Sequence, residues 1–194
     1  MHHARIAAFL LGAWLMGSLF MAYVATGNFA TVDQVLKAPS LEAEKMIQTL
    51  GNENARHLLR YLAGEENRGF FETWEIAEMI IGVGLAAFLI LGLKQRLSAA
   101  LTAAIIILTG FQHFKITPEM VWLGRSIDFI AWTADSQARS QFYKLHAAYG
   151  IIEGAKLLLM LVVAGFLFTM SRRRSRQRVE VNAVDYADHR HVDR

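Results

Sequence analysis

The sequence predicts an all-α membrane protein, a four-span transmembrane helical bundle with short amphipathic helices in its outer loops. Hydrophobic residues make up 54% of the 194 residues and charged residues only 19%, against a usual ~45–50% and ~25%. The mean hydropathy of +0.29 is high for a soluble chain. Four segments are long enough to cross a bilayer, which takes ~20 mostly apolar residues. The sequence has no cysteine, which excludes disulfides, thiolate metal sites and thiol catalysis.

The predicted spans are Ile6–Ala25, Ile76–Leu93, Leu97–Phe114 and Ala147–Met170. They form one membrane domain over residues 1–171, with outer loops 26–75 and 115–145. Ile6–Ala25 shows no polar face, which argues against a soluble bundle. A cleaved signal peptide is the alternative for this first span. Its apolar stretch exceeds the ~7–15 residues of a signal peptide's hydrophobic region and no clean cleavage site follows, so we expect the span to be retained.

Basic residues predict the orientation. Lys94 and Arg96 occupy the short turn between spans two and three, Arg5 precedes span one, and arginines follow span four. The positive-inside rule makes this side cytoplasmic. We therefore expect a cytoplasmic (inner or plasma) membrane location with both termini inside. The tail, residues 172–194, is expected to contact lipid headgroups, not nucleic acid, through Arg172, Arg173, Arg174 and Arg176.

Local patterns predict short helices in the outer segments. Ser40 is positioned to cap a helix over Leu41–Leu50, which Gly51 would end. A second helix is expected to begin at Asn52 and end at Gly64. Thr117-Pro118-Glu119 is a typical opening for another helix, with apolar residues from Met120 to Ile130 at steps of three and four.

Ionisable residues inside spans are rare and costly, so each is a site hypothesis. The predicted intramembrane polar cluster comprises Glu75, Glu78, His113, His146, Tyr149, Glu153 and Lys156. In the threading above, Glu78 lies ~6 Å deep, Glu153 ~10 Å and Lys156 ~15 Å. The polar groups of three spans would then meet in the outer half of the bundle.

Several interpretations of this cluster remain open. The favoured one is structural: Lys156 pairs with Glu153 or Glu78, because a bare charge would not persist there. A proton or ion pathway through Glu78, Glu153 and Lys156 is an alternative. A metal site would use His113, His146 and Glu78, and a haem would need both histidines facing across the bundle. No cofactor is expected, because no Glu-x-x-His motif is present, and no known catalytic motif supports an enzyme.

A GxxxG motif, Gly150 to Gly154, marks a face of span four that allows close helix approach. Internal packing is the expected use of this face. The alternative is a homodimer, or contact with another membrane protein, through Gly150 and Gly154.

Short motifs carry a family resemblance. They are Trp14-Leu15-Met16-Gly17-Ser18-Leu19-Phe20 in span one, Phe142-Tyr-Lys-Leu-His146 before the last span, and the connection from Thr117-Pro118-Glu119 to Arg125. From Arg5 to Phe168 the chain resembles the four-span membrane proteins of unknown function grouped with transmembrane protein 205 (domain of unknown function 4149). The resemblance implies the four-span fold and a membrane location, but no activity.

The sequence therefore predicts a non-enzymatic multi-pass integral membrane protein that acts as an accessory or assembly partner. The first alternative is a small transporter or ion-translocating protein using Glu78, Glu153 and Lys156. The second is a metal- or haem-binding membrane subunit using His113 and His146. A transporter usually shows internal repeats or broken helices, and neither is evident in the sequence.

Overall fold

The chain folds into long helices, with no strand among the described residues. The computed structural model describes the backbone of residues 2–130 and 136–189, with side chains over 3–130 and 136–169. The elements in order are α1 (His2–Lys37), α2 (Leu41–Leu50), α3 (Asn52–Ala87), the π-helical turn η1 (Phe88–Gly92), α4 (Arg96–Phe111), the π-helical turn η2 (Gln112–Ile116), α5 (Thr117–Ile127) and α6 (Gln137–His189).

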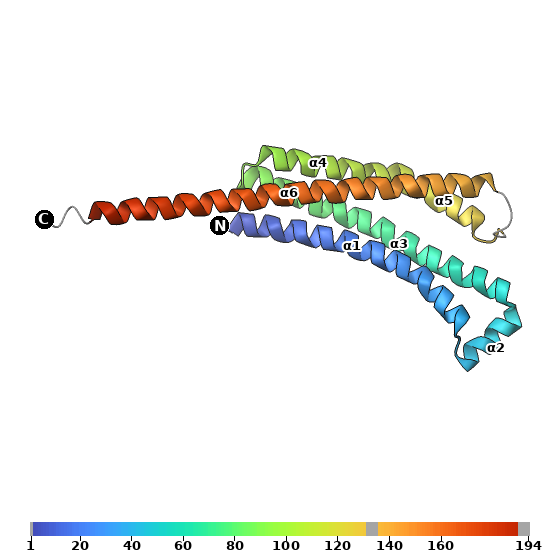
Figure 1. The fold of residues 1–194 in the computed structure, drawn as a ribbon. Helices are drawn as coiled ribbons and strands as arrows, with labels where there is room; N and C mark the ends of the chain where they lie inside the picture. Colours follow the sequence, from blue (N-terminus) through green and yellow to red (C-terminus); the bar gives the residue numbers. More distant parts are fainter. Residues whose placement is uncertain (1, 131–135, 190–194) are drawn as a thin grey trace.

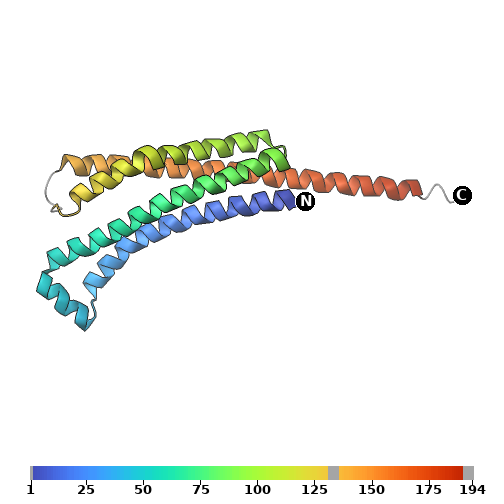
Figure 2. The same cartoon turned by 180° about the vertical axis from the view of Figure 1, so that it is seen from behind.

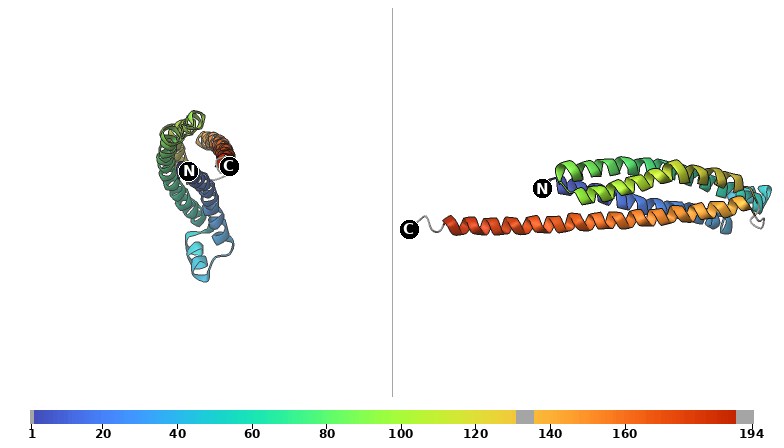
Figure 3. Two further views of the ribbon diagram at one scale, coloured as in Figure 1. Left: turned by 90° about the vertical axis from the view of Figure 1, so that its left-hand side faces the viewer. Right: turned by 90° about the horizontal axis from the view of Figure 1, so that it is seen from above.

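Four helical stretches are long and apolar enough to cross a membrane, which confirms the predicted fold class. They are His3–Lys37, Asn52–Gly92, Arg96–Ile127 and Gln137–Thr169. The stretches alternate in direction, so the N-terminus and the α3–α4 turn lie at one end of the bundle, the terminal end (Figure 1). The opposite end, the α2 end, carries α2. The last part of α6 projects past the terminal end (Figure 3).

Capping explains where the short helix α2 begins and ends. The Ser40 hydroxyl accepts a hydrogen bond from the Ala43 backbone N–H at 3.3 Å, as predicted for an N-cap. Gly51 has φ of +81°, a conformation that glycine adopts without steric cost, and it separates α2 from α3. Lys94 turns the chain between α3 and α4 with φ of +55°.

The predicted helix end at Gly64 is wrong. The helix runs on from Asn52 to Ala87, so residues 52–75 of the segment expected as an outer loop continue the second span, and residues 26–37 continue α1. A glycine inside a helix costs only ~1 kcal/mol, and the continued helix buries Ala63, Gly64 and Asn67. Likewise, α5 continues α4 through η2. Pro118 is the second residue of α5, in a first helical turn, where the missing backbone donor of proline is tolerated.

The hydrophobic core fills the half of the bundle nearer the terminal end. Its fully buried members include Trp14, Leu85, Leu89, Ile105 and Met160. The outward faces remain apolar, with Phe9 73%, Leu91 80% and Phe168 73% exposed. Exposed side chains of this kind suit a lipid environment and would be unfavourable in water.

Gly82 allows close packing between helices, whereas Gly150 and Gly154 have no neighbouring atoms to pack against. The ring of Trp14 and the side chain of Ile106 lie where a Cβ on Gly82 would be, within 2.8 Å. Gly150 and Gly154, in contrast, have no atom within 4 Å of an added Cβ. The expectation that these two glycines pack inside the chain is therefore wrong, because their face of α6 points away from the other described helices. Their use by a partner or a second copy stays a prediction.

Candidate functional site

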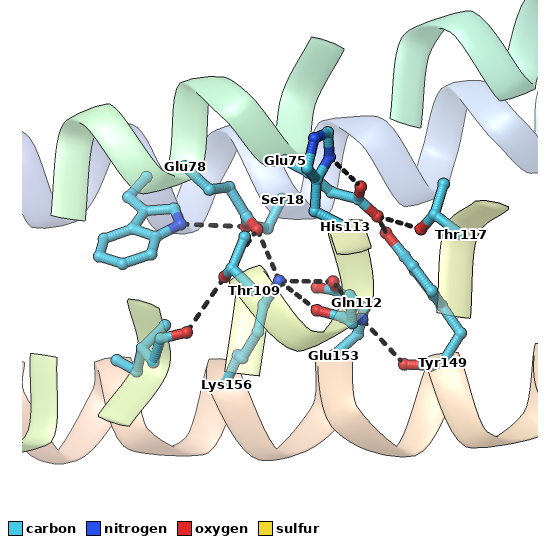
Figure 4. Close-up of polar contacts among 12 residues, drawn as sticks. Ser18, Glu75, Glu78, Thr109, Gln112, His113, Thr117, Tyr149, Glu153 and Lys156 are labelled. Atoms are coloured by element: carbon cyan, nitrogen blue, oxygen red, sulfur yellow. Dashed lines mark hydrogen bonds and ion pairs between the residues drawn. The ribbon is translucent and has the colours of Figure 1, made fainter. Parts of the chain in front are cut away.

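Lys156 lies at the centre of a buried ion cluster between α3, α4–η2 and α6. Its side chain is 0% exposed. Its Nζ donates to Glu78 Oε2 at 2.5 Å, to Glu153 Oε1 at 2.6 Å and to Gln112 Oε1 at 2.9 Å (Figure 4). An ammonium has three donors, and all three have an acceptor. The contacts agree with the pairing hypothesis, and the ammonium meets both candidate carboxylates rather than one.

Helices α1 and α4 complete the surroundings of Glu78. Its Oε1 accepts hydrogen bonds from Trp14 Nε1 at 3.0 Å and Ser18 Oγ at 2.8 Å, both on α1. Its Oε2 accepts from Thr109 Oγ1 at 3.3 Å. These residues face the same point because Trp14 and Ser18 are one helical turn apart. One fully buried carboxylate thus connects all four long helical stretches.

A second buried carboxylate, Glu75, lies one turn nearer the α2 end. It is 0% exposed. Its Oε1 accepts from Thr117 Oγ1 at 2.6 Å and Tyr149 Oη at 3.1 Å, and its Oε2 lies 3.0 Å from His113 Nδ1. The spacing of three between Glu75 and Glu78 places both carboxylates on the inner face of α3.

Gln112 joins the two carboxylate sites. Its Nε2 donates to Glu153 Oε1 at 3.1 Å and to the backbone carbonyl of Tyr149 at 3.4 Å. The two carboxylate sites are therefore linked through Tyr149, whose backbone carbonyl accepts from Gln112 and whose hydroxyl donates to Glu75 (Figure 4). Both ends of the Gln112 amide are used, and its side chain is fully buried.

The structure brings together six of the seven residues predicted to form the polar cluster and leaves out His146. The six are Glu75, Glu78, His113, Tyr149, Glu153 and Lys156. His146 is exposed, and its ring stacks on Phe142 with centroids 5.9 Å apart. Its placement in the cluster is wrong, because it lies two turns before Glu153 on α6 and lines the cavity instead of bonding to a cluster residue.

Sequence reasoning missed the neutral partners of the cluster, namely Trp14, Ser18, Thr109, Gln112 and Thr117. Their signal was present but weak. Trp14 with Ser18, and Thr109 with Gln112, are polar pairs at helical spacing inside otherwise apolar spans. A buried charge needs such donors, so these positions were the available candidates.

A cavity of about 470 Å³ lies between α1, α3, α5 and α6 toward the α2 end. Here α1 and α3 bend away from α6 together (Figure 2). Tyr149 and Thr117, which bind Glu75, form its inner end. Its apolar lining includes Phe29, Phe71, Met120, Ile127 and Phe142. The predicted helix from Met120 thus lines the cavity, whereas α2 contributes no lining residue.

Ion pairs hold the wall of this cavity. Arg68 donates to both oxygens of Asp128, at 3.0 and 2.9 Å. Glu65 accepts from Arg68 at 2.5 Å and from Arg125 at 2.8 Å. Burial raises the pKa of Asp128 above its usual value, and the guanidinium of Arg68 opposes this rise. These contacts fix α5 and the residue after it against α3.

The described side chains, those of residues 3–130 and 136–169, contain no group of three His, Asp or Glu that could hold a metal ion. His113 bonds to Glu75, whereas His146 lines the cavity. The arginines predicted to contact headgroups, Arg172 to Arg176, lie outside the described side chains.

The described network also ends before the terminal end of the bundle. Beyond Lys156 in that direction lie buried apolar side chains such as Leu89 and Met160, together with the hydroxyls of Thr102 and Ser98. Thr102 donates to the Ser98 carbonyl, and the Ser98 Oγ has no hydrogen-bond partner. The described polar contacts thus do not continue from the cavity to the other end.

Fold and site together define an all-α bundle with four helical stretches long and apolar enough to cross a membrane, a buried ion network between them and a cavity beside that network. No family model, curated protein or solved structure matches the chain.

Proposed function

We propose that this chain is a non-enzymatic integral protein of the cytoplasmic membrane, with both termini in the cytoplasm, that acts by binding a small molecule in its cavity. The apolar outward faces of its four long helices support the membrane location. The basic turn at Lys94 and Arg96 and the arginines in the last part of α6 support the orientation. In this orientation the α2 end and its cavity face away from the cytoplasm.

The observation that carries the binding role is the contrast between a saturated ion network and an open cavity. Every donor of Lys156 has an acceptor, and Glu78 has four polar contacts. Groups held in this way stabilise helix packing and have little capacity for chemistry. The cavity, at about 470 Å³, has the size and mixed lining of ligand sites, which span ~300–1,000 Å³.

Ion translocation through Glu78, Glu153 and Lys156 is the less favoured function. It requires a polar route across the whole bundle, and the described contacts end against the apolar core. An accessory role toward another membrane protein, as the resemblance to the transmembrane protein 205 group leaves open, is compatible with a binding protein.

The test is to purify the protein in mild detergent and identify bound small molecules by native mass spectrometry. Ala25 lines the cavity, so Ala25→Trp should fill the space and remove the bound species. The matched control is Ala22→Trp, an exposed position one turn earlier on α1 that does not line the cavity. Equal occupancy of wild type and Ala25→Trp, or no bound species in either, would contradict binding at this site.

A further inference from the structure

The charged side chains that line the cavity all have partners within the protein. Arg68 donates to both oxygens of Asp128, at 3.0 and 2.9 Å, and to Glu65 at 2.5 Å. The other lining arginines also have partners, Arg60 with Asp33 at 3.6 Å and Arg139 with the backbone carbonyl of Ile130 at 3.0 Å. An ionised ligand would therefore enter the cavity without an unpaired opposite charge to meet, and burial of an unpaired charge is strongly unfavourable.

Most neutral polar side chains of the lining are also hydrogen-bonded within the protein. These are Thr26, His57, Asn67, Thr117 and Tyr149. Two lining side chains differ, because the hydroxyl of Tyr143 and the imidazole nitrogens of His146 have no hydrogen-bond partner among residues 3–130 and 136–169. They lie three residues apart on α6, so both face the same side of the helix.

Apolar side chains surround this pair of polar groups. The larger ones are Phe29, Phe71, Met120, Val121, Ile127 and Phe142. The His146 ring stacks on Phe142 with centroids 5.9 Å apart, and the Phe71 ring meets Tyr149 edge to face at 5.6 Å. Burial of hydrocarbon against such a lining is the main source of affinity for an apolar ligand.

We propose that the cavity binds a neutral lipid whose polar group is a hydroxyl, held by His146 and Tyr143, with its hydrocarbon part directed toward Phe71 and Tyr149. This assignment rests on the proposed binding function and adds the charge and the polar group of the ligand. A hydroxyl suits these partners because it both donates and accepts, so it pairs with either tautomer of a neutral imidazole.

The experiment uses the full chain in nanodiscs of phosphatidylcholine at about pH 8, where an exposed imidazole is neutral. The probe is a long-chain alcohol that carries a photoreactive diazirine in its chain, and mass spectrometry locates the crosslinked residues. We expect crosslinks to Phe29 and Phe142, which line the cavity. Leu91 and Phe168, which are 80% and 73% exposed on the outward faces, report contact with the bulk lipid in the same sample.

Competition measures the charge preference of the cavity. The competitors are dodecanol, dodecanesulfonate and dodecyltrimethylammonium, which share one chain length and are neutral, negative and positive. Dodecanol should suppress crosslinking in the cavity at a concentration about tenfold or more below that of either ion, because neither ion meets an unpaired opposite charge. Crosslinking of the outward faces controls for uptake of each competitor into the bilayer.

Variants locate the hydroxyl. His146→Phe keeps an aromatic ring beside Phe142 and removes both nitrogens, so it should weaken binding of the alcohol about fivefold, or about 1 kcal/mol. The matched control is Gln141→Phe, an exposed polar position of α6 that does not line the cavity, and it should bind as wild type. Melting temperatures measured without the probe identify a variant that fails to fold. In that case Tyr143→Phe, which removes only a hydroxyl, replaces it with the same expected direction.

The outcomes separate the two proposals. If all three competitors act equally, or an ion acts best, while Ala25→Trp abolishes crosslinking in the cavity, the cavity is a ligand site but the neutral assignment is overturned. Wild-type affinity in both His146→Phe and Tyr143→Phe would overturn the assignment of the hydroxyl. If the cavity is crosslinked no more than the outward faces, or Ala25→Trp changes nothing, the binding function itself fails. Selective competition by dodecanol, weakened in His146→Phe but not in Gln141→Phe, supports both proposals.

Discussion

Replacing Lys156 with methionine should be among the most destabilising single changes in the buried network. Methionine has a similar length but leaves Glu78 and Glu153 without their shared cation. Lys156 and Glu78 are both 0% exposed, and breaking a buried ion pair costs ~3–5 kcal/mol. The hydrogen bonds from Trp14 and Ser18 to Glu78 remain, which places the expected loss toward the lower end of this range.

Glu153→Gln should cost less. Lys156 keeps Glu78 and Gln112 as acceptors, and Glu153 is 24% exposed. We expect about 1–3 kcal/mol, the value of one hydrogen bond to a charged group. Because the two residues are in contact, the losses should not add. The double variant should lose ~0.5–3 kcal/mol less than the sum of the single variants.

The assay is the free energy of unfolding in mixed micelles titrated with sodium dodecyl sulfate. Lys144→Met is the matched control, since it removes the same charge from an exposed position of α6 and should change stability by less than about 0.5 kcal/mol. A loss for Lys156→Met no larger than the control, or strictly additive losses in the double variant, would refute the role of the ion cluster.

Two further predictions concern packing and hydrogen bonding. Gly82→Ala should destabilise the bundle by ~1–3 kcal/mol, because the added Cβ would overlap the side chains of Trp14 and Ile106. The control Gly84→Ala should be neutral or stabilising, because no atom lies within 4 Å of a Cβ added there. Equal melting temperatures for the two variants would contradict this packing. Tyr149→Phe should lose ~1.5–3 kcal/mol with its bond to Glu75, while the exposed Tyr143→Phe should lose less than about 0.5 kcal/mol. A Tyr149 variant as stable as the Tyr143 variant would show that this bond contributes nothing.

The helices and the charged residues of the site were accessible from sequence because both have a strong physical signal. A run such as Ile6–Ala25, which contains no charged residue, predicts a membrane-spanning helix, because a helix satisfies every backbone polar group within the segment. Glu78 and Lys156 stand out because an ionisable residue in an apolar segment needs a partner. The cap at Ser40 and the stop at Gly51 are similarly local and were predicted correctly.

The continuation of α3 past Gly64, the position of His146 and the cavity could not be predicted from sequence, because each depends on contacts between helices. Gly64 carries the local signal of a helix end, yet packing of the following turns against α1 and α5 continues the helix. His146 does share a face of α6 with Glu153, but two turns away, where the bundle contains the cavity and the ring stacks on Phe142. The cavity has no local signal, because its lining comes from four separate segments.

Single-cysteine labelling in intact cells tests the central claim, that four helices cross the membrane and leave the cavity end outside. The chain has no native cysteine, so Gln48→Cys on α2 and Ser175→Cys in the basic tail each give one thiol without changing the charge. A membrane-impermeant maleimide should label residue 48 in intact cells, and residue 175 only after permeabilisation. Labelling of both positions in intact cells, or of residue 175 alone, would contradict the proposed threading.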